Sequence, residues 1–121
     1  MFEDHTGSTH ILHGINAVYK QPPWIPIIDY YDSNDSFSMV DMLRIKSCGF
    51  NVVRLGVMWA GVMPLPPNGT YIDADGKLKD NYYINNTYLS EIERIVGMLG
   101  DLGIYSILDM HQDVLNRHFC G

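Results

Sequence analysis

The residues from Phe50 to Trp59 form a nearly continuous apolar run that contains a single charged residue, Arg54. A strand without polar alternation is typical of a parallel sheet that is covered on both faces. Two further strand-like runs flank it, one at residues 11–19 and one that starts at Ile104. Helical segments separate the three runs, so we predict strand, helix, strand, helix, strand, with the strands parallel.

Capping signals delimit the two helices. The first is predicted to begin near Ser38, whose spacing to Asp41 matches a capping box, and to end at Gly49. The second is predicted to begin around Thr87 and to continue with apolar residues at helical spacing until Gly103.

Two long segments show neither helical nor strand periodicity. Residues 21–35 contain three prolines together with Trp24, Tyr30 and Tyr31, which predicts a rigid aromatic loop. This loop either holds sugar rings or apolar tails, or packs on the protein surface. Residues 64–83 are predicted to be an irregular, solvated excursion. Residues 73–77 faintly resemble a calcium loop, but the ligand spacing is unfinished and no terminal glutamate follows, so we reject calcium.

Residue parity assigns one polar face to each predicted strand, because alternate residues of a strand share a face. The polar faces carry Gly14, Asn16 and Lys20 in the first strand, Arg54 and Gly56 in the second, and Asp109, His111 and Asp113 in the third. The opposite faces are apolar and suited to pack on helices; they carry Ile15, Ala17, Val53, Leu55, Val57, Leu108 and Met110. The agreement of three strands predicts a shared polar cavity.

Individual residues in the three strands provide further support for a polar cavity. A lone arginine in an apolar strand is expected to meet a carboxylate, so Arg54 should have an acidic partner. Gly14 inside the first strand indicates close approach by another backbone or a ligand. Asp109, His111 and Asp113 are costly to bury unless they are paired, which favours a site over a core.

Two other interpretations of the third strand remain. In the first, Asp109 caps the strand and His111 is a hydrogen-bonded core histidine. In the second, Asp109, His111 and Asp113 are metal ligands of a hydrolase, which is weakened because no second cluster of histidine or cysteine completes a site. We therefore predict no metal and no cofactor.

Two architectures fit the order of elements: an open doubly wound sheet, or the start of a (β/α)8 barrel. The glycine-rich phosphate fingerprint of a nucleotide-binding sheet is missing after the first strand, which disfavours the open sheet. We predict an α/β fold, an incomplete (β/α)8 TIM barrel with its first three parallel strands and two intervening helices. In such barrels the active site lies at the carboxyl ends of the strands.

Composition narrows the partners. The 121 residues carry a formal net charge of −6, and 46% are hydrophobic, which is typical of a foldable globular sequence. The eight lysines and arginines are scattered, so neither nucleic acid nor an anionic membrane is expected as the main partner. No apolar run approaches the roughly 18 residues that a spanning helix needs.

Three asparagines, Asn34, Asn68 and Asn85, begin glycosylation acceptor patterns and favour a secreted or lysosomal protein. The amino terminus shows no signal peptide, which hints that the sequence is incomplete. Cys48 and Cys120 could form one bridge, but two cysteines do not decide this.

Several segments together resemble the endoglycoceramidases, retaining β-glycosidases of the cellulase-like barrel superfamily that release the intact oligosaccharide from ceramide. The segments are His13–Lys20 with Pro22-Pro23, Gly49–Trp59, and Leu108–Leu115 with Phe119–Gly121. The resemblance implies that Lys20, Asp109, His111 and Asp113 bind the sugar next to the scissile bond, and that Arg54 supports the catalytic nucleophile. The expected partner is a glycosphingolipid or another β-glycoside, with peripheral contact to lipid surfaces.

The resemblance also implies that the two catalytic glutamates follow the fourth and seventh strands, beyond Gly121. Residues 1–121 are then the N-terminal part of one glycosidase barrel, truncated after the third strand and inactive alone, since such barrels need about 250 residues. Ala60 and Met63 stand where the family more often has Pro and Glu, and the loop at 64–83 is longer than usual. The alternatives are a related β-glucosidase or endoglucanase acting on simpler glucosides, and a non-catalytic carbohydrate-binding remnant.

Overall fold

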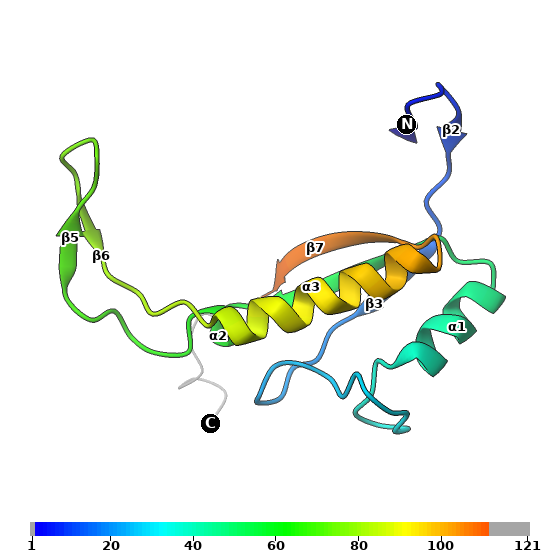
Figure 1. Ribbon diagram of the computed structural model, residues 1–121, viewed down its shortest axis with the longest axis horizontal. Coiled ribbons are helices and arrows are strands. Elements are labelled where there is room, and N and C mark those ends of the chain that lie inside the picture. Colours follow the sequence, from blue (N-terminus) through cyan, green and yellow to red (C-terminus); the bar gives the residue numbers. More distant parts are fainter. Residues whose placement is uncertain (1, 112–121) are drawn as a thin grey trace.

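A computed structural model describes residues 2–111, and its centre is a three-stranded parallel sheet (Figure 1). The strands are β3 (Gly14–Ala17), β4 (Val52–Met58) and β7 (Tyr105–His111), and β4 lies between the other two. Both pairings are parallel. The predicted parallel α/β arrangement of three strands is therefore confirmed.

Two helices connect these strands and lie on one side of the sheet, as the ribbon in Figure 1 shows. They are α1 (Met39–Ser47), between β3 and β4, and α3 (Asn86–Asp101), between β4 and β7. The carboxylate of Asp41 accepts a hydrogen bond from the backbone N–H of Ser38 at 2.8 Å, which caps α1 as the sequence predicted. Gly49 follows α1 with a φ of 82°, a conformation that glycine adopts without strain.

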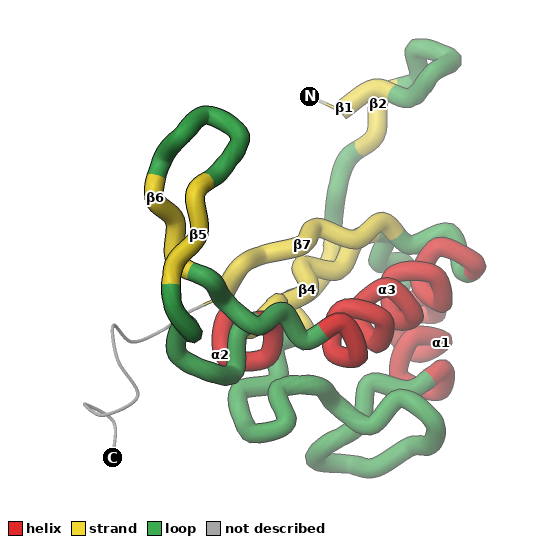
Figure 2. Tube along the Cα trace, turned by 60° about the vertical axis from the view of Figure 1, so that its left-hand side comes forward, coloured by secondary structure: helices red, strands yellow, loops and turns green. Residues whose placement is uncertain are grey.

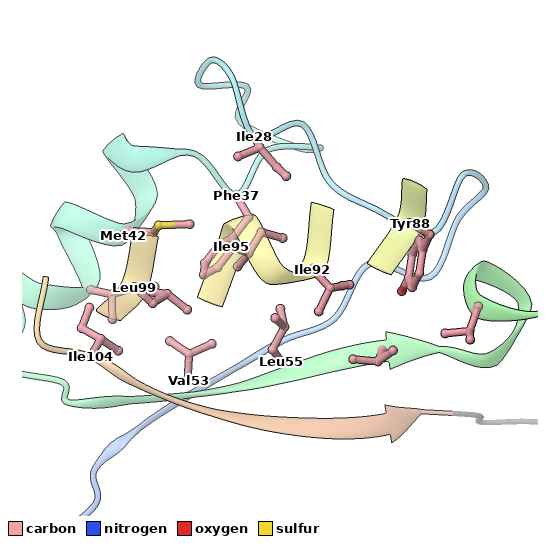
Figure 3. Packing of buried hydrophobic residues seen from close by; sticks show 13 residues of the cluster. Ile28, Phe37, Met42, Val53, Leu55, Tyr88, Ile92, Ile95, Leu99 and Ile104 are labelled. Carbon is pink, nitrogen blue, oxygen red and sulfur yellow. The ribbon is translucent and has the colours of Figure 1, made fainter. Parts of the chain in front are cut away.

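The core lies between the helices and the face of the sheet that is turned toward them, which we call the outer face (Figure 3). Val53, Leu55 and Val57 of β4 are buried there, which confirms their predicted packing on helices. Helix α3 contributes an apolar stripe and the loop before α1 contributes two further side chains. The remaining buried members are Ile28, Phe37, Met42, Ile45, Val62, Tyr88, Ile92, Ile95, Leu99 and Ile104.

The same prediction is wrong for the outer face of β7. Leu108 and Met110 are 57% and 54% exposed, although their register partners Leu55 and Val57 are buried. The reason is position in the sheet: β4 is the central strand of the three, and β7 is an edge strand.

Strand β3 is shorter than the predicted run of residues 11–19. In the residues before β3, hydrogen bonds from the Asn51 side chain take the place of strand pairing. The amide nitrogen of Asn51 donates to the carbonyl of Ile11 at 2.8 Å. Its amide oxygen accepts from the N–H of His13, also at 2.8 Å. The chain is therefore held against β4 before regular pairing begins at Gly14.

Residues 64–83 are not irregular as predicted but contain a hairpin of β5 (Thr70–Ile72) and β6 (Leu78–Asp80). The segment is solvated as predicted, because Figures 1 and 2 show the hairpin projecting away from the sheet and helices. Its turn is organised by Asp73, whose carboxylate accepts from the N–H groups of Asp75 at 3.0 Å and Lys77 at 2.8 Å. The sequence signal at 73–77 is thus that of a turn.

The aromatic loop at 21–35 mainly packs on the protein. Ile28 is buried in the core, and Asp29 forms an ion pair with Arg94 of α3 at 2.5 Å. The guanidinium of Arg44 lies 4.7 Å from the centre of the Tyr31 ring. These contacts favour surface packing for this part of the loop over a ligand-binding role.

Two short elements complete the described chain. An antiparallel hairpin of β1 (Phe2–Glu3) and β2 (Thr9–His10) turns at Gly7, and His10 meets the ring of Tyr105 edge-on at 5.9 Å. Helix α2 (Trp59–Val62) follows β4 directly. Within residues 2–111, no helix has the length and apolar character that crossing a bilayer requires.

Gly14 offers a direct test of the sheet. A Cβ at this position would lie 1.7 Å from the carbonyl oxygen of Val52, which confirms the predicted close approach of another backbone. We expect Gly14→Ala to lower the free energy of unfolding by about 1–3 kcal/mol or more, because the backbones must separate. Gly97→Ala on α3 is the matched control, since its Cβ would meet nothing within 4 Å. A helical alanine should stabilise by about 0.5–1 kcal/mol. Chemical denaturation measures both, and equal effects would contradict the packing described.

Candidate functional site

The face of the sheet that is turned away from the helices is called the inner face. The register of the strands determines which side chains share it. Asn16 pairs with Arg54, Gly56 pairs with Asp109, and Met58 pairs with His111. Register partners in neighbouring strands point to the same face. The shared face predicted by parity is therefore confirmed for Gly14, Asn16, Arg54, Gly56, Asp109 and His111. Lys20 lies outside β3, so its place on this face stays a prediction.

Arg54, Asp109 and His111 form a contact cluster on this face. One carboxylate oxygen of Asp109, Oδ2, lies 2.8 Å from Nη2 of Arg54 and 3.0 Å from Nδ1 of His111. The side chains of Asp109 and His111 are 24% and 20% exposed, and that of Arg54 is 50% exposed. The carboxylate partner predicted for Arg54 is thus Asp109.

The cluster extends from Arg54, near the start of β4, to His111, the last residue of β7. Towards the start of β7 the same face is apolar, with Tyr105 and Ile107, and it becomes polar at Asp109. A guanidinium, a carboxylate and an imidazole offer both donors and acceptors to a hydroxyl-rich ligand. Because Asp109 is held by two neighbours, it is fixed in position before any ligand arrives.

The other predicted site residues are placed less completely. Lys20 is exposed and follows the carboxyl end of β3 by three residues. Asp113 lies outside the described residues. Among residues 2–111 there is no group of three or more His, Cys, Asp or Glu side chains that could hold a metal ion.

Tyr88 supports the site and was missed by the sequence prediction. Its hydroxyl accepts a hydrogen bond from the backbone N–H of Met58 at 2.9 Å, at the residue where β4 ends beside His111. The side chain is buried, and burial raises its pKa. A Cβ on Gly61 would lie 2.5 Å from the Tyr88 ring, so the ring also fixes α2. The available signal was its spacing, since Tyr88 stands one turn before Ile92 on the apolar stripe of α3.

Comparison with known proteins identifies the family. Residues 11–119 match the family model described as cellulase (glycosyl hydrolase family 5). The chain belongs to glycosyl hydrolase family 5. The Arg54 cluster and Tyr88 all fall within the matched residues.

The relatives of this family 5 chain include proteins named endoglycoceramidase, so the predicted resemblance is confirmed. The one from Cyanea nozakii is 40% identical over 117 residues, which is 97% of this chain and 20% of the relative. The one from Hydra vulgaris is 35% identical over 120 residues, 99% of this chain and 20% of the relative. A crystal structure described as endogalactoceramidase aligns with a TM-score of 0.60 at 27% identity, over 92% of this chain and 21% of that structure. The chain thus spans about a fifth of the length of the proteins that it matches.

The three acceptor asparagines of this family 5 chain differ in accessibility. Asn34 and Asn68 are exposed. Asn85 is half-buried, and its side-chain oxygen accepts from the N–H of Tyr88 at 3.2 Å as the N-cap of α3. Cys48 is exposed, and Cys120 lies outside the described residues, so their pairing stays a prediction.

The anchoring of β4 by Tyr88 can be tested in the family 5 chain with Tyr88→Phe. The substitution keeps the ring against Gly61 but leaves the N–H of Met58 without its buried acceptor, which should cost about 1–3 kcal/mol of unfolding free energy. Tyr83→Phe is the control because Tyr83 is 58% exposed, and it should change stability by less than about 0.5 kcal/mol. Denaturant unfolding measures both. Tyr88→Phe behaving like the control would show that the hydrogen bond does not anchor β4.

Proposed function

We propose that this chain is the N-terminal part of a glycoside hydrolase that cleaves the β-glycosidic bond between the oligosaccharide and ceramide of glycosphingolipids. The observation that carries the proposal is the cluster of Arg54, Asp109 and His111, which share one face of β4 and β7. It lies in residues that align with relatives named endoglycoceramidase. In this function Lys20, Asp109, His111 and Asp113 bind the sugar next to the scissile bond.

The proposed mechanism is a retaining double displacement, which needs two carboxylates about 5 Å apart as acid/base and nucleophile. Asp109 is unsuited to either role, since its Oδ2 is already engaged by Arg54 and His111. Asp109 and Asp113 are also only four residues apart in the sequence, a spacing better suited to orienting substrate hydroxyls than to attack from opposite faces of a sugar. The two catalytic groups are therefore assigned to glutamates beyond residue 121, and Arg54 supports the nucleophile from below.

The exposed surfaces of the sheet support a larger (β/α)8 barrel. In residues 2–111, β3 and β7 each pair on one side only. The outer face of β7 leaves Leu108 and Met110 exposed, and a cavity of about 250 Å³ lies beside β3, lined in part by Ile15, Ala17 and Trp24. Further strands and helices would cover all three features. We accordingly expect the 121 residues alone to be inactive.

Contact with a lipid surface is proposed for the hairpin of β5 and β6. Ile72 and Leu78 are cross-strand partners next to its turn, and each is 70% exposed. The exposed Asn34 and Asn68 fit the proposal that the protein is secreted or lysosomal.

Cleavage of simpler β-glucosides is the second candidate, favoured by the description of the matching family as cellulase. A relative from Acetivibrio thermocellus named cellulase/esterase CelE aligns with 58% of this chain at 28% identity. Its alignment is shorter and weaker than those of the endoglycoceramidases, so we rank this candidate below the first.

The proposed function predicts the products. The complete natural chain containing these residues, incubated with a glycosphingolipid in detergent, should release one intact oligosaccharide and one ceramide. Mass spectrometry distinguishes this from stepwise release of single sugars. Cleavage of a soluble β-glucan without any cleavage of the glycosphingolipid would support the second candidate, and binding without cleavage would indicate a non-catalytic protein.

The role of Asp109 predicts a catalytic defect. Asp109→Asn removes the charge that holds Arg54 at 2.8 Å, and the resulting misplacement should lower kcat/KM on a glycosphingolipid about 100-fold. Asp101→Asn at the end of α3 is the control, because Asp101 is an exposed carboxylate away from the cluster. Steady-state kinetics on the complete natural chain measure both variants. An unchanged kcat/KM for Asp109→Asn would remove the cluster from the proposed site.

A further inference from the structure

An open hollow lies at the base of the hairpin of β5 and β6. The volume of this hollow is about 400 Å³, within the range of about 300–1,000 Å³ that is usual for small-molecule sites. One wall comes from the hairpin and the residues that follow it, and the other from the end of α2 and the lead into α3. The lining residues are Met63, Tyr71, Asp80, Asn81, Tyr82 and Ile84.

The hollow lies close to the candidate site along the chain. Met58 ends β4 beside His111, the single turn of α2 follows, and Met63 comes directly after α2. The N–H of Asn85 donates to the carbonyl of Val62 at 2.9 Å, which ties the other wall to the same helix. Along the chain, only α2 therefore separates the end of β4 from the first lining residue of the hollow.

The side chains that line the hollow indicate the class of ligand that fits it. Two tyrosine rings offer flat apolar faces, and the carboxylate of Asp80 and the amide of Asn81 offer hydrogen-bonding groups. This combination of ring faces and polar edges matches a sugar, whose ring has apolar C–H faces and an equator of hydroxyls. The side-chain nitrogen of Asn81 already donates to the carbonyl of Asn68 at 3.3 Å. A lipid chain would still cover the carboxylate of Asp80 without offering it a hydrogen-bond donor, which is unfavourable.

The charge of the lining sets a preference among sugars. The described lining contains one carboxylate, that of Asp80, and no lysine or arginine. Lys79, the cross-strand partner of Tyr71, lies 4.0 Å from Asp73 at the turn and does not line the hollow. An acidic sugar would meet Asp80 without a compensating cation, so a neutral sugar is favoured.

We propose that this hollow is a binding subsite for an outer, neutral sugar of the oligosaccharide headgroup. The inference rests on the proposed function for the direction of the substrate, but the subsite is a separate property of the hairpin. With this subsite, a segment of about twenty residues outside the parallel sheet would discriminate between headgroups by their length and charge.

The length dependence is the first test, made on the complete natural chain. Tyr71→Ala and Tyr82→Ala should each lower kcat/KM about five- to tenfold on a glycosphingolipid with four neutral sugars, from the loss of ring stacking. Both should leave kcat/KM unchanged on a single-sugar β-glycoside of a nitrophenol. Tyr71→Phe keeps the ring and should restore most of the lost rate. Tyr83→Ala is the matched control, because Tyr83 adjoins Tyr82 but does not line the hollow.

Two outcomes would overturn the subsite. Equal losses on the long and the short substrate would mean that the tyrosines support the fold, and no loss on either would mean that the hollow binds no sugar. The proposed function fails separately, if no ceramide is released from any glycosphingolipid. In that case the free neutral tetrasaccharide, titrated calorimetrically, still tests the subsite, which requires weaker binding by Tyr71→Ala and unchanged binding by Tyr83→Ala.

The charge preference is tested with Asp80→Asn. The unaltered protein should bind the free neutral tetrasaccharide more tightly than the same oligosaccharide with a terminal sialic acid. Asp80→Asn should narrow that difference several-fold, with the larger effect at low salt. Asp75→Asn at the hairpin turn is the control, since Asp75 is exposed and outside the hollow. An unchanged ratio of the two affinities in Asp80→Asn would remove Asp80 from the subsite and overturn the neutral-sugar assignment.

Discussion

The parallel pairing of β4 with its two neighbours is the constraint on which the rest of the structure depends. Because the pairing is in register, Arg54 of β4 reaches Asp109 of β7 across the sheet. A shift of one residue would turn Asp109 and His111 toward the helices and place Leu108 among the polar groups. The apolar contacts of Val53 and Leu55 with the helices hold that register, so the core and the polar cluster are set by the same strand.

Much of this arrangement could be predicted from the sequence. The apolar run around Arg54, the capping residues near Ser38 and the glycines after each helix were sufficient for the order of elements and for the polar face. These features are local, and each acts through its neighbours in the chain. The carboxylate partner of Arg54 could be anticipated because a charge in an apolar strand needs compensation.

What could not be predicted depends on contacts between distant segments. Tyr88 is thirty residues from Met58, and nothing in the local pattern shows that its hydroxyl would reach that N–H. The hairpin at residues 70–80 lacked a strong strand signal because its strands are three residues long and solvated on both faces. The exposure of Leu108 and Met110 follows from the position of β7 at the edge of the sheet, which parity alone does not reveal.

The way the β5 and β6 hairpin is attached has an evolutionary consequence. The N–H of Asn68 donates to the carbonyl of Asn81 at 2.7 Å, and the N–H of Asn81 donates to the carbonyl of Gly69 at 2.9 Å. The two chain segments that connect the hairpin to the rest of the protein are therefore hydrogen-bonded to each other at its base. We therefore expect the sheet and helices to tolerate insertions, deletions and replacements in residues 70–80. Sequence changes in the hairpin could then alter substrate recognition during evolution, while the catalytic chemistry and the thermal stability of the barrel are retained.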